Sequence, residues 1–191
     1  TSVKHGQFFM LSIPMVGEAP ISVSAQGDGY VEFTIRKVGR LTNGLFGLTE
    51  GDMLFMRGPY GNAFPIKDFK HKHLVIIAGG TGVAPVRSTM QYFYDHPEDI
   101  ESLYVIAGFK DMNAVLFRDD LKKFSEAPRF HTTWCLDNSE APGFHKGLVT
   151  QYISQVPFDS FGEDYNIIIV GPPAMFRFAA AGCMKAGAVE D

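Results

Sequence analysis

A run of branched apolar residues that ends in glycines constrains the fold of this chain more than any other feature. Residues 74–78 read LVIIA, and residues 79–85 read GGTGVAP. An uninterrupted apolar run of this length predicts a parallel strand buried on both faces. The glycines permit a tight turn and a close approach of backbone N–H groups to an anion, and residues 83–94 predict a helix whose positive end favours that anion. The pattern predicts the phosphate site of a dinucleotide, with a purely structural turn as the alternative.

A second turn of this kind lies far downstream. Residues 166–170 read NIIIV and predict another buried strand, and residues 171–175 read GPPAM. Ligands of open parallel sheets bind beyond the carboxyl ends of the strands. We therefore expect the two turns to form two walls of one crevice, although either turn alone could be structural.

The chain divides into two halves with different periodicities. From residue 74 onward, strands and helices alternate, which predicts a parallel sheet with helices on both faces. The expected strands are 74–78, 103–107, 130–136 and 167–170, and the expected helices are 83–94, 114–124, 147–155 and 173–186.

The first half predicts β-structure instead. Short strands separated by glycine and proline are typical of a small antiparallel barrel. The expected strands are 7–13, 30–38 and 52–57, the last of them closed by a turn at 58–62. With a boundary in the polar stretch 67–73, the expected domains are an antiparallel β domain at 1–70 and an α/β domain at 71–191.

Composition excludes several classes of protein. The 191 residues are 46% hydrophobic, the net charge is −4, and no basic cluster appears, so a nucleic-acid partner is not expected. No apolar stretch approaches the roughly 18 residues that cross a bilayer. No signal peptide precedes Thr1, so a cytoplasmic protein is expected. Cys135 and Cys183 belong to no C-x-x-C pair and the histidines show no ligand spacing, so no metal site is expected.

Two short motifs in the β half combine small residues, hydroxyls and positive charge. Pro20-Ile21-Ser22 follows an acidic loop, and residues 39–43 read GRLTN. Together with Arg36 and Arg40, the Thr42 hydroxyl can hold a pyrophosphate beside an apolar slot. The alternative is a barrel with two ordinary turns and solvated arginines.

These motifs together resemble the ferredoxin–NADP reductase superfamily. Their order is P-I-S, G-x-x-T-N, R-G-P-Y-G-N, G-G-T-G-V-A-P and G-P-P-x-M, and the similarity covers essentially the whole chain. Within the superfamily, residues 6–14, 17–24, 31–40 and 57–62 are most similar to the B subunits of anaerobic sulfite reductases. Related electron-transfer subunits of hydrogenases and of dihydroorotate dehydrogenase share much of the pattern.

The resemblance implies FAD in the β half and a nicotinamide dinucleotide, NAD(H), in the α/β half, with the two rings meeting between them. The FAD residues carried over by position are Pro20, Ile21, Ser22, Thr34, Ile35, Arg36, Gly39, Arg40, Leu41, Thr42 and Asn43. The NAD(H) residues are Gly80, Thr81, Gly82, Phe109, Lys110, Asp111, Asp137, Gly171, Pro172 and Pro173. No side chain is expected to act as an acid or base, because the cofactors carry the hydride chemistry.

Asp137 is expected to favour NADH over NADPH. It lies in the stretch Leu136-Asp137-Asn138-Ser139-Glu140, where NADP-dependent relatives place arginine. A carboxylate accepts a hydrogen bond from a ribose 2′-hydroxyl and repels a 2′-phosphate. A solvated turn is the alternative, since Asp-Asn-Ser is good turn chemistry.

The chain departs from the superfamily pattern in three ways. Ala19 and Ile21 replace an arginine on the FAD pyrophosphate and a tyrosine that stacks on the flavin, so weaker FAD retention is expected, with Arg36 or Arg40 as the replacement charge. Val170 stands where many relatives have a cysteine. The chain is also expected to be a fragment without the first barrel strands and without a cysteine-rich tail that binds a [2Fe–2S] cluster.

The function implied by the resemblance is that of an electron-input subunit. Electrons would pass from NADH through FAD and the [2Fe–2S] cluster to the other sulfite reductase subunits, of iron–sulfur and sirohaem type, which reduce sulfite to sulfide. The same role in a hydrogenase or a dihydroorotate dehydrogenase is one alternative. A non-catalytic nucleotide-binding module that has lost FAD is another.

Overall fold

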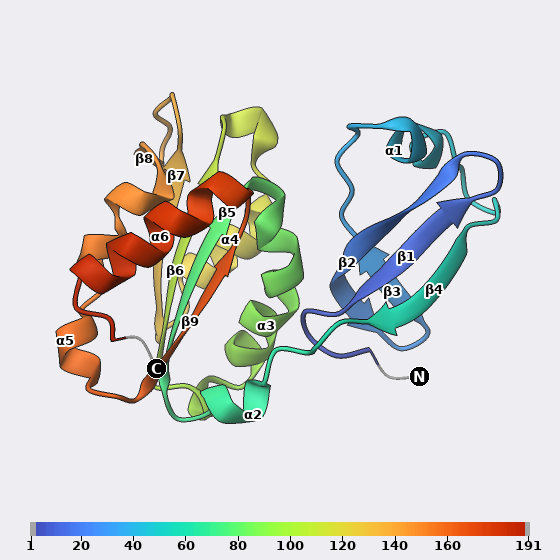
Figure 1. Cartoon of the computed structure of the whole chain (residues 1–191). Coiled ribbons are helices and arrows are strands. Elements are labelled where there is room, and N and C mark those ends of the chain that lie inside the picture. Colours follow the sequence, from blue (N-terminus) through green and yellow to red (C-terminus); the bar gives the residue numbers. More distant parts are fainter. Residues whose placement is uncertain (1–2, 190–191) are drawn as a thin grey trace. The chain divides into compact units, whose positions relative to one another are not determined.

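The computed structural model describes residues 3–189. Their contacts divide the chain into two compact units, which separate between Phe64 and Pro65, and residues 84–89 are grouped with the first unit. Figure 1 shows an antiparallel sheet in blue and teal and a parallel sheet in colours from green to red. The antiparallel half precedes the parallel half along the chain, as predicted.

The first unit is built on a four-stranded antiparallel sheet with the strand order β3-β2-β1-β4. The strands are β1 (Phe8–Ile13), β2 (Gly17–Gly27), β3 (Tyr30–Phe33) and β4 (Phe55–Tyr60). The buried core consists of Phe9, Leu11 and Val23, and its partly buried neighbours include Val31, Phe33 and Ile35. Val31, Phe33 and Ile35 are therefore the residues of the segment 30–38 that face the core.

β3 ends at Phe33, well before the predicted end of the strand at Val38. The Ser24 hydroxyl donates to the Glu32 carbonyl oxygen (3.1 Å) and accepts from the Thr34 hydroxyl (2.9 Å). These bonds lie where the register between β2 and β3 shifts. Because the pairing is disturbed there, the chain leaves the sheet after Phe33.

The segment predicted as a turn at residues 39–43 begins a short helix instead, α1 (Arg40–Leu45). This helix packs against β1 and β2. β4 is shifted along the chain and runs through the predicted turn 58–62 as far as Tyr60. The reason is an earlier turn, in which the Asp52 carboxylate accepts hydrogen bonds from the backbone N–H and the hydroxyl of Thr49. A proline is tolerated in β4 because it is an edge strand.

The second unit is built on a five-stranded parallel sheet with the order β8-β7-β6-β5-β9. The strands are β5 (His73–Gly79), β6 (Ser102–Phe109), β7 (Phe130–Leu136), β8 (His145–Lys146) and β9 (Tyr165–Val170). Every residue from Leu74 to Ala78 in β5 is 0% exposed. The prediction of a parallel strand buried on both faces is confirmed.

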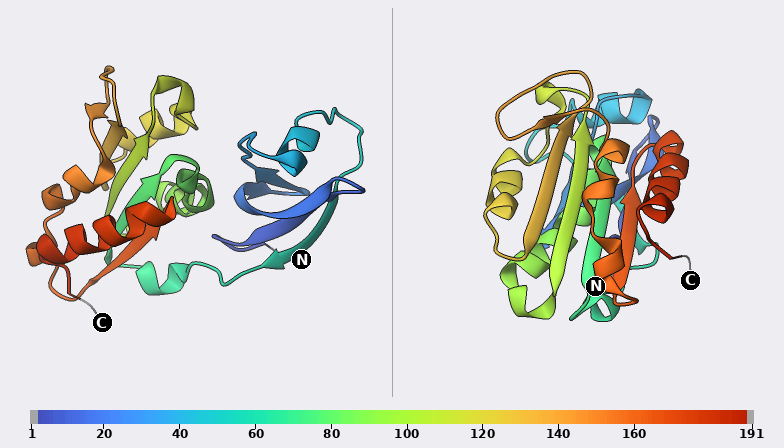
Figure 2. Two further views of the ribbon diagram at one scale, coloured as in Figure 1. Left: turned by 45° about the horizontal axis from the view of Figure 1, so that its top comes forward. Right: turned by 90° about the vertical axis from the view of Figure 1, so that its left-hand side faces the viewer.

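Helices cover both faces of the parallel sheet, as the right-hand view in Figure 2 shows. One face carries α5 (Phe158–Phe161) and α6 (Pro173–Lys185), and the other carries α3 (Val83–Asp95) and α4 (Arg118–Ser125). A short helix, α2 (Ile66–Phe69), precedes β5. Cys135 in β7 and Cys183 in α6 are both buried. Among residues 3–189, no helix is both long and apolar enough to span a membrane.

Two predicted helices take other forms. The helix expected at 114–124 begins only at Arg118, because Phe117 before it has a left-handed backbone with φ of 53°. The segment expected as a helix at 147–155 forms two 3₁₀ turns, Val149–Gln151 and Ile153–Gln155. Both turns still bury apolar side chains against the sheet. The apolar residues that predict an α-helix at 147–155 are thus buried by two 3₁₀ turns instead.

Candidate functional site

The two glycine turns lie side by side at the carboxyl edge of the parallel sheet. β5 and β9 are neighbours, and Ala78 pairs with Val170 at the end of both strands. Residues 80–82 form a 3₁₀ turn that leads into α3, and Pro173 begins α6. The two turns therefore lie at one edge of the sheet, which is the part of the predicted two-walled crevice that the strand pairing supports.

Gly82 and Gly171 allow the backbones of the two turns to pack directly on each other. Gly82 is buried, and a Cβ atom there would collide with the carbonyl oxygen of Val170. A Cβ atom at Gly171 would lie 3.1 Å from the backbone nitrogen of Gly79. These glycines are therefore required by the contact between the turns, which is a different role from the ligand clearance that the sequence suggests.

Gly80 is the glycine that faces open space. Its backbone is left-handed, with φ of 56°, a conformation that favours glycine. A Cβ atom at this position would meet no atom within 4 Å. Thr81 beside it is exposed. The turn therefore presents unobstructed backbone just before α3, which is the geometry that binds a pyrophosphate.

The carboxyl end of β6 contributes three of the predicted residues in three different ways. Phe109 is 1% exposed, so its side chain belongs to the core. The Asp111 carboxylate accepts hydrogen bonds from the backbone N–H groups of Asn113 (2.9 Å) and Ala114 (3.2 Å), which closes the turn after the strand. Lys110 is exposed. Of these three residues, Lys110 is the one whose side chain extends into solvent.

Asp137 lies directly beyond the carboxyl end of β7. Its backbone N–H donates to the carbonyl oxygen of Phe109 (2.9 Å), so the ends of β6 and β7 are tied together. Partial burial raises the pKa of the Asp137 carboxyl above its usual value. In the same loop, the Ser139 hydroxyl is buried and has no hydrogen-bond partner among the described residues. The loop thus carries two polar groups with incomplete solvation at the edge of the sheet.

In the first unit, β2 divides Pro20, Ile21 and Ser22 between its two faces. The register pairs Ile21 with the buried Phe9 and Ser22 with Phe8. Ile21 packs against the core that contains Phe9. Because successive side chains of a strand point to opposite faces, Pro20 and Ser22 lie on the side away from this core.

The segment after β3 also distributes its predicted residues. The Thr34 hydroxyl is bonded within the sheet, and Ile35 packs against the core. Leu41 is buried, whereas Arg36 and Asn43 are exposed. The exposed guanidinium of Arg36 places a positive charge in the segment that follows β3.

The Thr42 hydroxyl is fully used at the start of α1. Its oxygen accepts hydrogen bonds from the N–H groups of Val38 (2.9 Å) and Gly39 (2.8 Å), and it donates to the Gly39 carbonyl oxygen (3.0 Å). Arg40 donates to the carbonyl oxygen of Met15 (2.8 Å). A Cβ atom at Gly39 would meet nothing within 4 Å. This loop is therefore held together internally and is open at Gly39.

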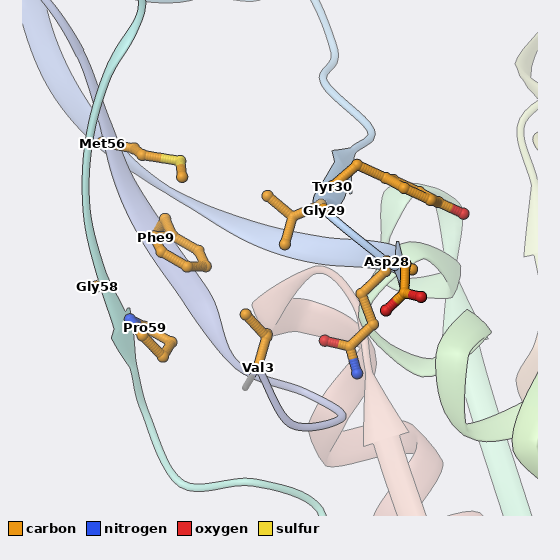
Figure 3. A pocket seen from close by; sticks show the side chains of 11 residues that line it. Val3, Phe9, Asp28, Gly29, Tyr30, Met56, Gly58 and Pro59 are labelled. Atoms are coloured by element: carbon orange, nitrogen blue, oxygen red, sulfur yellow. The ribbon is translucent and has the colours of Figure 1, made fainter. Parts of the chain in front are cut away.

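A cavity of about 790 Å³ opens elsewhere in the first unit, and Figure 3 shows its lining. Phe9, Met56 and Pro59 form apolar walls, and Asp28 and Tyr30 lie at the rim. The residues predicted to bind FAD are not among its lining residues. Its charged lining group is the carboxylate of Asp28, which would repel a pyrophosphate.

Two residues at the edge of the parallel sheet lie within the two predicted motifs but are not among the individual residues predicted to bind NAD(H). Gly79 ends β5, and a Cβ atom there would lie 2.7 Å from the sulfur atom of Met175 in α6. The glycine doublet at residues 79–80 indicates Gly79. Met175 can be recognised only when β9 and α6 are placed beside β5. Within residues 3–189, no group of three or more His, Cys, Asp or Glu side chains is arranged to hold a metal ion.

A family model described as the oxidoreductase NAD-binding domain matches residues 76–181. The match includes both glycine turns and the ends of β6 and β7. The chain belongs to the oxidoreductase NAD-binding domain family. The nicotinamide dinucleotide expected from the two turns is the ligand that gives this family its name.

Curated relatives of this NAD-binding chain include subunits of larger enzymes. The sulfhydrogenase 2 gamma subunit of Pyrococcus furiosus is 34% identical over 198 residues, which cover 96% of this chain and 68% of that protein. A probable dihydroorotate dehydrogenase B (NAD(+)) electron transfer subunit of Methanocaldococcus jannaschii is 32% identical over 176 residues, which cover 91% of this chain and 60% of that protein. The chain thus spans 60% to 68% of the length of these two relatives.

Solved structures show the same fold for this NAD-binding chain. A ferredoxin NADP⁺ reductase from Neisseria gonorrhoeae, described with bound FAD and NADP, has a TM-score of 0.78 at 18% identity. The match covers 99% of this chain and 82% of that structure. Identity this low shows the fold alone. The shared fold confirms the predicted architecture, an antiparallel sheet followed by a parallel sheet with helices on both faces.

Proposed function

We propose that this chain is the NADH-oxidising, FAD-binding electron-transfer subunit of a multisubunit enzyme. The proposal rests on the two glycine turns at the ends of β5 and β9, which pack backbone to backbone and leave Gly80 open. A dinucleotide pyrophosphate fits such a turn, because free N–H groups and the positive end of α3 both favour an anion. The relatives add support, since each is described as a subunit and one as an electron transfer subunit.

The second unit would hold NAD(H) along the carboxyl edge of its sheet. In this proposal Gly80 and Thr81 bind the pyrophosphate, and residues 171–173 line the nicotinamide end. Lys110 and Asp137 stand at the ends of β6 and β7, where the adenosine would extend. The remaining predicted residues, Gly82, Phe109 and Asp111, support this edge through packing and turn closure.

Asp137 is proposed to set the preference for NADH. Its carboxylate would accept a hydrogen bond from the ribose 2′-hydroxyl and would repel the 2′-phosphate of NADPH. The test compares the rates of flavin reduction by NADH and by NADPH in the wild type and in Asp137→Arg. We expect the substitution to move the ratio toward NADPH by about tenfold or more. A wild type that favours NADPH, or a ratio that does not move, would remove Asp137 from this role.

The first unit would hold FAD at the outer face of β2 and the start of α1. Pro20 and Ser22 share that face of the strand, and Gly39 leaves an open approach to the start of the helix. Arg36 is the better replacement for the missing pyrophosphate arginine, because Arg40 is already bonded to a backbone carbonyl. Bound FAD would accept a hydride from NADH and release electrons singly.

The partner is proposed to be the catalytic part of a hydrogenase or a dihydroorotate dehydrogenase. The descriptions of the two relatives favour these enzymes over a sulfite reductase. A sulfite reductase is the second candidate, supported by residues 6–14, 17–24, 31–40 and 57–62. That candidate includes a [2Fe–2S] cluster on a C-terminal segment and iron–sulfur and sirohaem-type partner subunits. A cytoplasmic location is part of both proposals.

The visible absorption spectrum of the purified natural protein tests the proposed function. We expect a yellow protein with two flavin bands that bleach when NADH is added. A colourless protein that stays empty after FAD is added would contradict the proposal and favour a non-catalytic nucleotide-binding module. Copurification then separates the partners, because hydrogenase and sulfite reductase subunits differ in their metal centres.

A further inference from the structure

We infer that Met175 is a positioning residue, which supports the backbones of Gly79 and Gly171 where the two glycine turns pack on each other. The inference rests on the proposed function, in which these turns bind NAD(H). Met175 lies in the first turn of α6, three positions after the proline that precedes the helix, and its backbone N–H donates to the Pro172 carbonyl oxygen (2.9 Å). The residue is thus attached to the second turn and reaches toward the first.

The side chain of Met175 fills the space that two glycines leave empty. A Cβ atom at Gly79 would lie 2.7 Å from its sulfur, and a Cβ atom at Gly171 would lie 2.7 Å from its terminal methyl group. One thioether therefore contacts a glycine from each turn. Neither glycine could gain a side chain unless Met175 moved.

The other side of Met175 is held by the core. It packs against the buried cluster that contains Val75, Ile77 and Ala179, which joins the sheet to α6. A methionine side chain bends to fit an irregular gap, and here the gap is bounded by core atoms below and by the two turns above. The two turns touch through their backbones at Gly82, and Met175 supports that contact from the core side by filling the space beside Gly79 and Gly171.

Loss of the support that Met175 gives to the two turns would alter the binding of the dinucleotide. Gly80, whose open backbone faces the proposed pyrophosphate, follows directly on the Gly79 that Met175 contacts. Shortening Met175 removes the support under Gly79, so the turn can sample several positions in place of one. Small displacements of a binding group are costly because the ligand must then select the productive arrangement.

The first experiment measures the dissociation constant for NAD⁺ by calorimetry on the FAD-loaded protein. We expect Met175→Ala to bind NAD⁺ about tenfold more weakly, with an unchanged flavin spectrum, and Met175→Leu to stay within about threefold of the wild type. The matched control is Ile153→Ala, or Ile153→Val where the alanine variant does not fold. Ile153 is buried and contacts α6 near Gly182, far along the helix from the turns.

The control decides between positioning and general stability. A loss of thermal stability without a change in NAD⁺ affinity is expected for the Ile153 variant. Equal weakening of NAD⁺ binding in both variants would overturn the inference, because any loosening of α6 would then suffice. Unchanged binding in Met175→Ala would overturn it as well. If the wild type binds neither NAD⁺ nor NADH, the proposed function fails instead.

A double-mutant cycle provides the second test. Gly79 has an extended backbone (φ −117°, ψ 121°), which alanine adopts without strain, so the cost of Gly79→Ala arises from the atoms that its Cβ would meet. The nearest of these is the sulfur of Met175, and the next is the Pro172 ring at 3.0 Å. We expect Gly79→Ala to weaken NAD⁺ binding in the wild type and to restore it partly in Met175→Ala. Additive effects would contradict direct contact as the cause.

Discussion

The two proposed cofactor sites, one in each unit, are held in place by different forces. At the ends of β5 and β9, glycine backbones pack directly on one another, and the strand behind them is 0% exposed from Leu74 to Ala78. At the start of α1, the loop is held by hydrogen bonds that the Thr42 hydroxyl accepts from backbone N–H groups and that Arg40 donates to a backbone carbonyl oxygen. Backbone packing leaves no room for an added atom, whereas a hydrogen-bonded loop accepts any change that preserves its bonds. The second unit should therefore be the more sensitive to added volume.

The largest effect expected from this comparison is that of Gly82→Ala. The new Cβ atom would collide with the backbone of Val170, which is paired with Ala78 in the sheet and cannot move aside without breaking that pairing. We expect the free energy of unfolding to fall by about 3 kcal/mol, as measured by denaturant titration followed by circular dichroism. Gly39→Ala is the matched control in the first unit, because its Cβ atom meets nothing and its backbone is extended. Equal losses in the two variants would remove the contrast.

A second prediction separates backbone strain from ligand clearance at Gly80. Gly80→Ala should cost about 1–2 kcal/mol, because alanine is strained at a φ of 56°. Gly80→Asn should be closer to the wild type in stability, since asparagine tolerates the left-handed region. It should nevertheless bind NAD⁺ more weakly, because its side chain enters the open space in front of the turn. An asparagine variant with wild-type affinity would show that the pyrophosphate does not lie there.

A third prediction concerns the hydrogen-bonded loop of the first unit. Thr42→Val removes the acceptor of two backbone N–H groups, those of Val38 and Gly39, and should cost about 1–2 kcal/mol in the free energy of unfolding. Thr42→Ser keeps the hydroxyl and serves as the control, with a smaller loss. FAD affinity should fall together with stability in the valine variant. A loss of FAD affinity at full stability would instead indicate a direct bond from Thr42 to the ligand.

The smallest expected effect is a pH dependence caused by Asp137. Burial raises the pKa of its carboxyl above 3.8, so the folded state holds the proton more tightly than the unfolded state does. The contribution of this group to stability is therefore fully present at acidic pH and is lost as the pH rises through the raised pKa. Relative to Asp137→Asn, the wild type should lose melting temperature as the pH rises from below 3.8, the ordinary pKa of the carboxyl, through its raised pKa. A difference that stays constant with pH would contradict this account.

The parts of the fold that could be predicted are those whose sequence reflects burial alone. The strands expected at 74–78 and 167–170 both form. Of the two, only residues 74–78 are buried throughout; β9 is an edge strand whose residues are mostly half-buried, so the burial predicted for residues 166–170 is wrong. The helix expected at 147–155 does not form, because the spacing of Val149 and Ile153 suits a 3₁₀ turn as well. α1 was not predicted, since its first turn depends on hydrogen bonds made by one threonine.

The candidate site likewise has features that could be predicted from the sequence and features that could not. The meeting of the two turns follows from a general rule about the carboxyl ends of parallel strands, so it could be predicted from motif positions. The separate roles of Gly80 and Gly82 could not be predicted. They depend on where Val170 lies, and that contact joins segments far apart in the sequence. A glycine that clears space for a ligand and a glycine that clears space for the backbone look alike until the neighbour is placed.

The buried positions of Cys135 and Cys183 have a practical consequence. Burial raises the pKa of the two thiols to about 12 and about 11, so both remain protonated at neutral pH and react poorly with maleimides. These are the only two cysteines in the sequence. A cysteine introduced at an exposed position, such as Ser154, would therefore be the one readily labelled thiol. Pairs of such positions, one in each unit, would allow fluorescence or spin-label distances to be measured with the native cysteines retained.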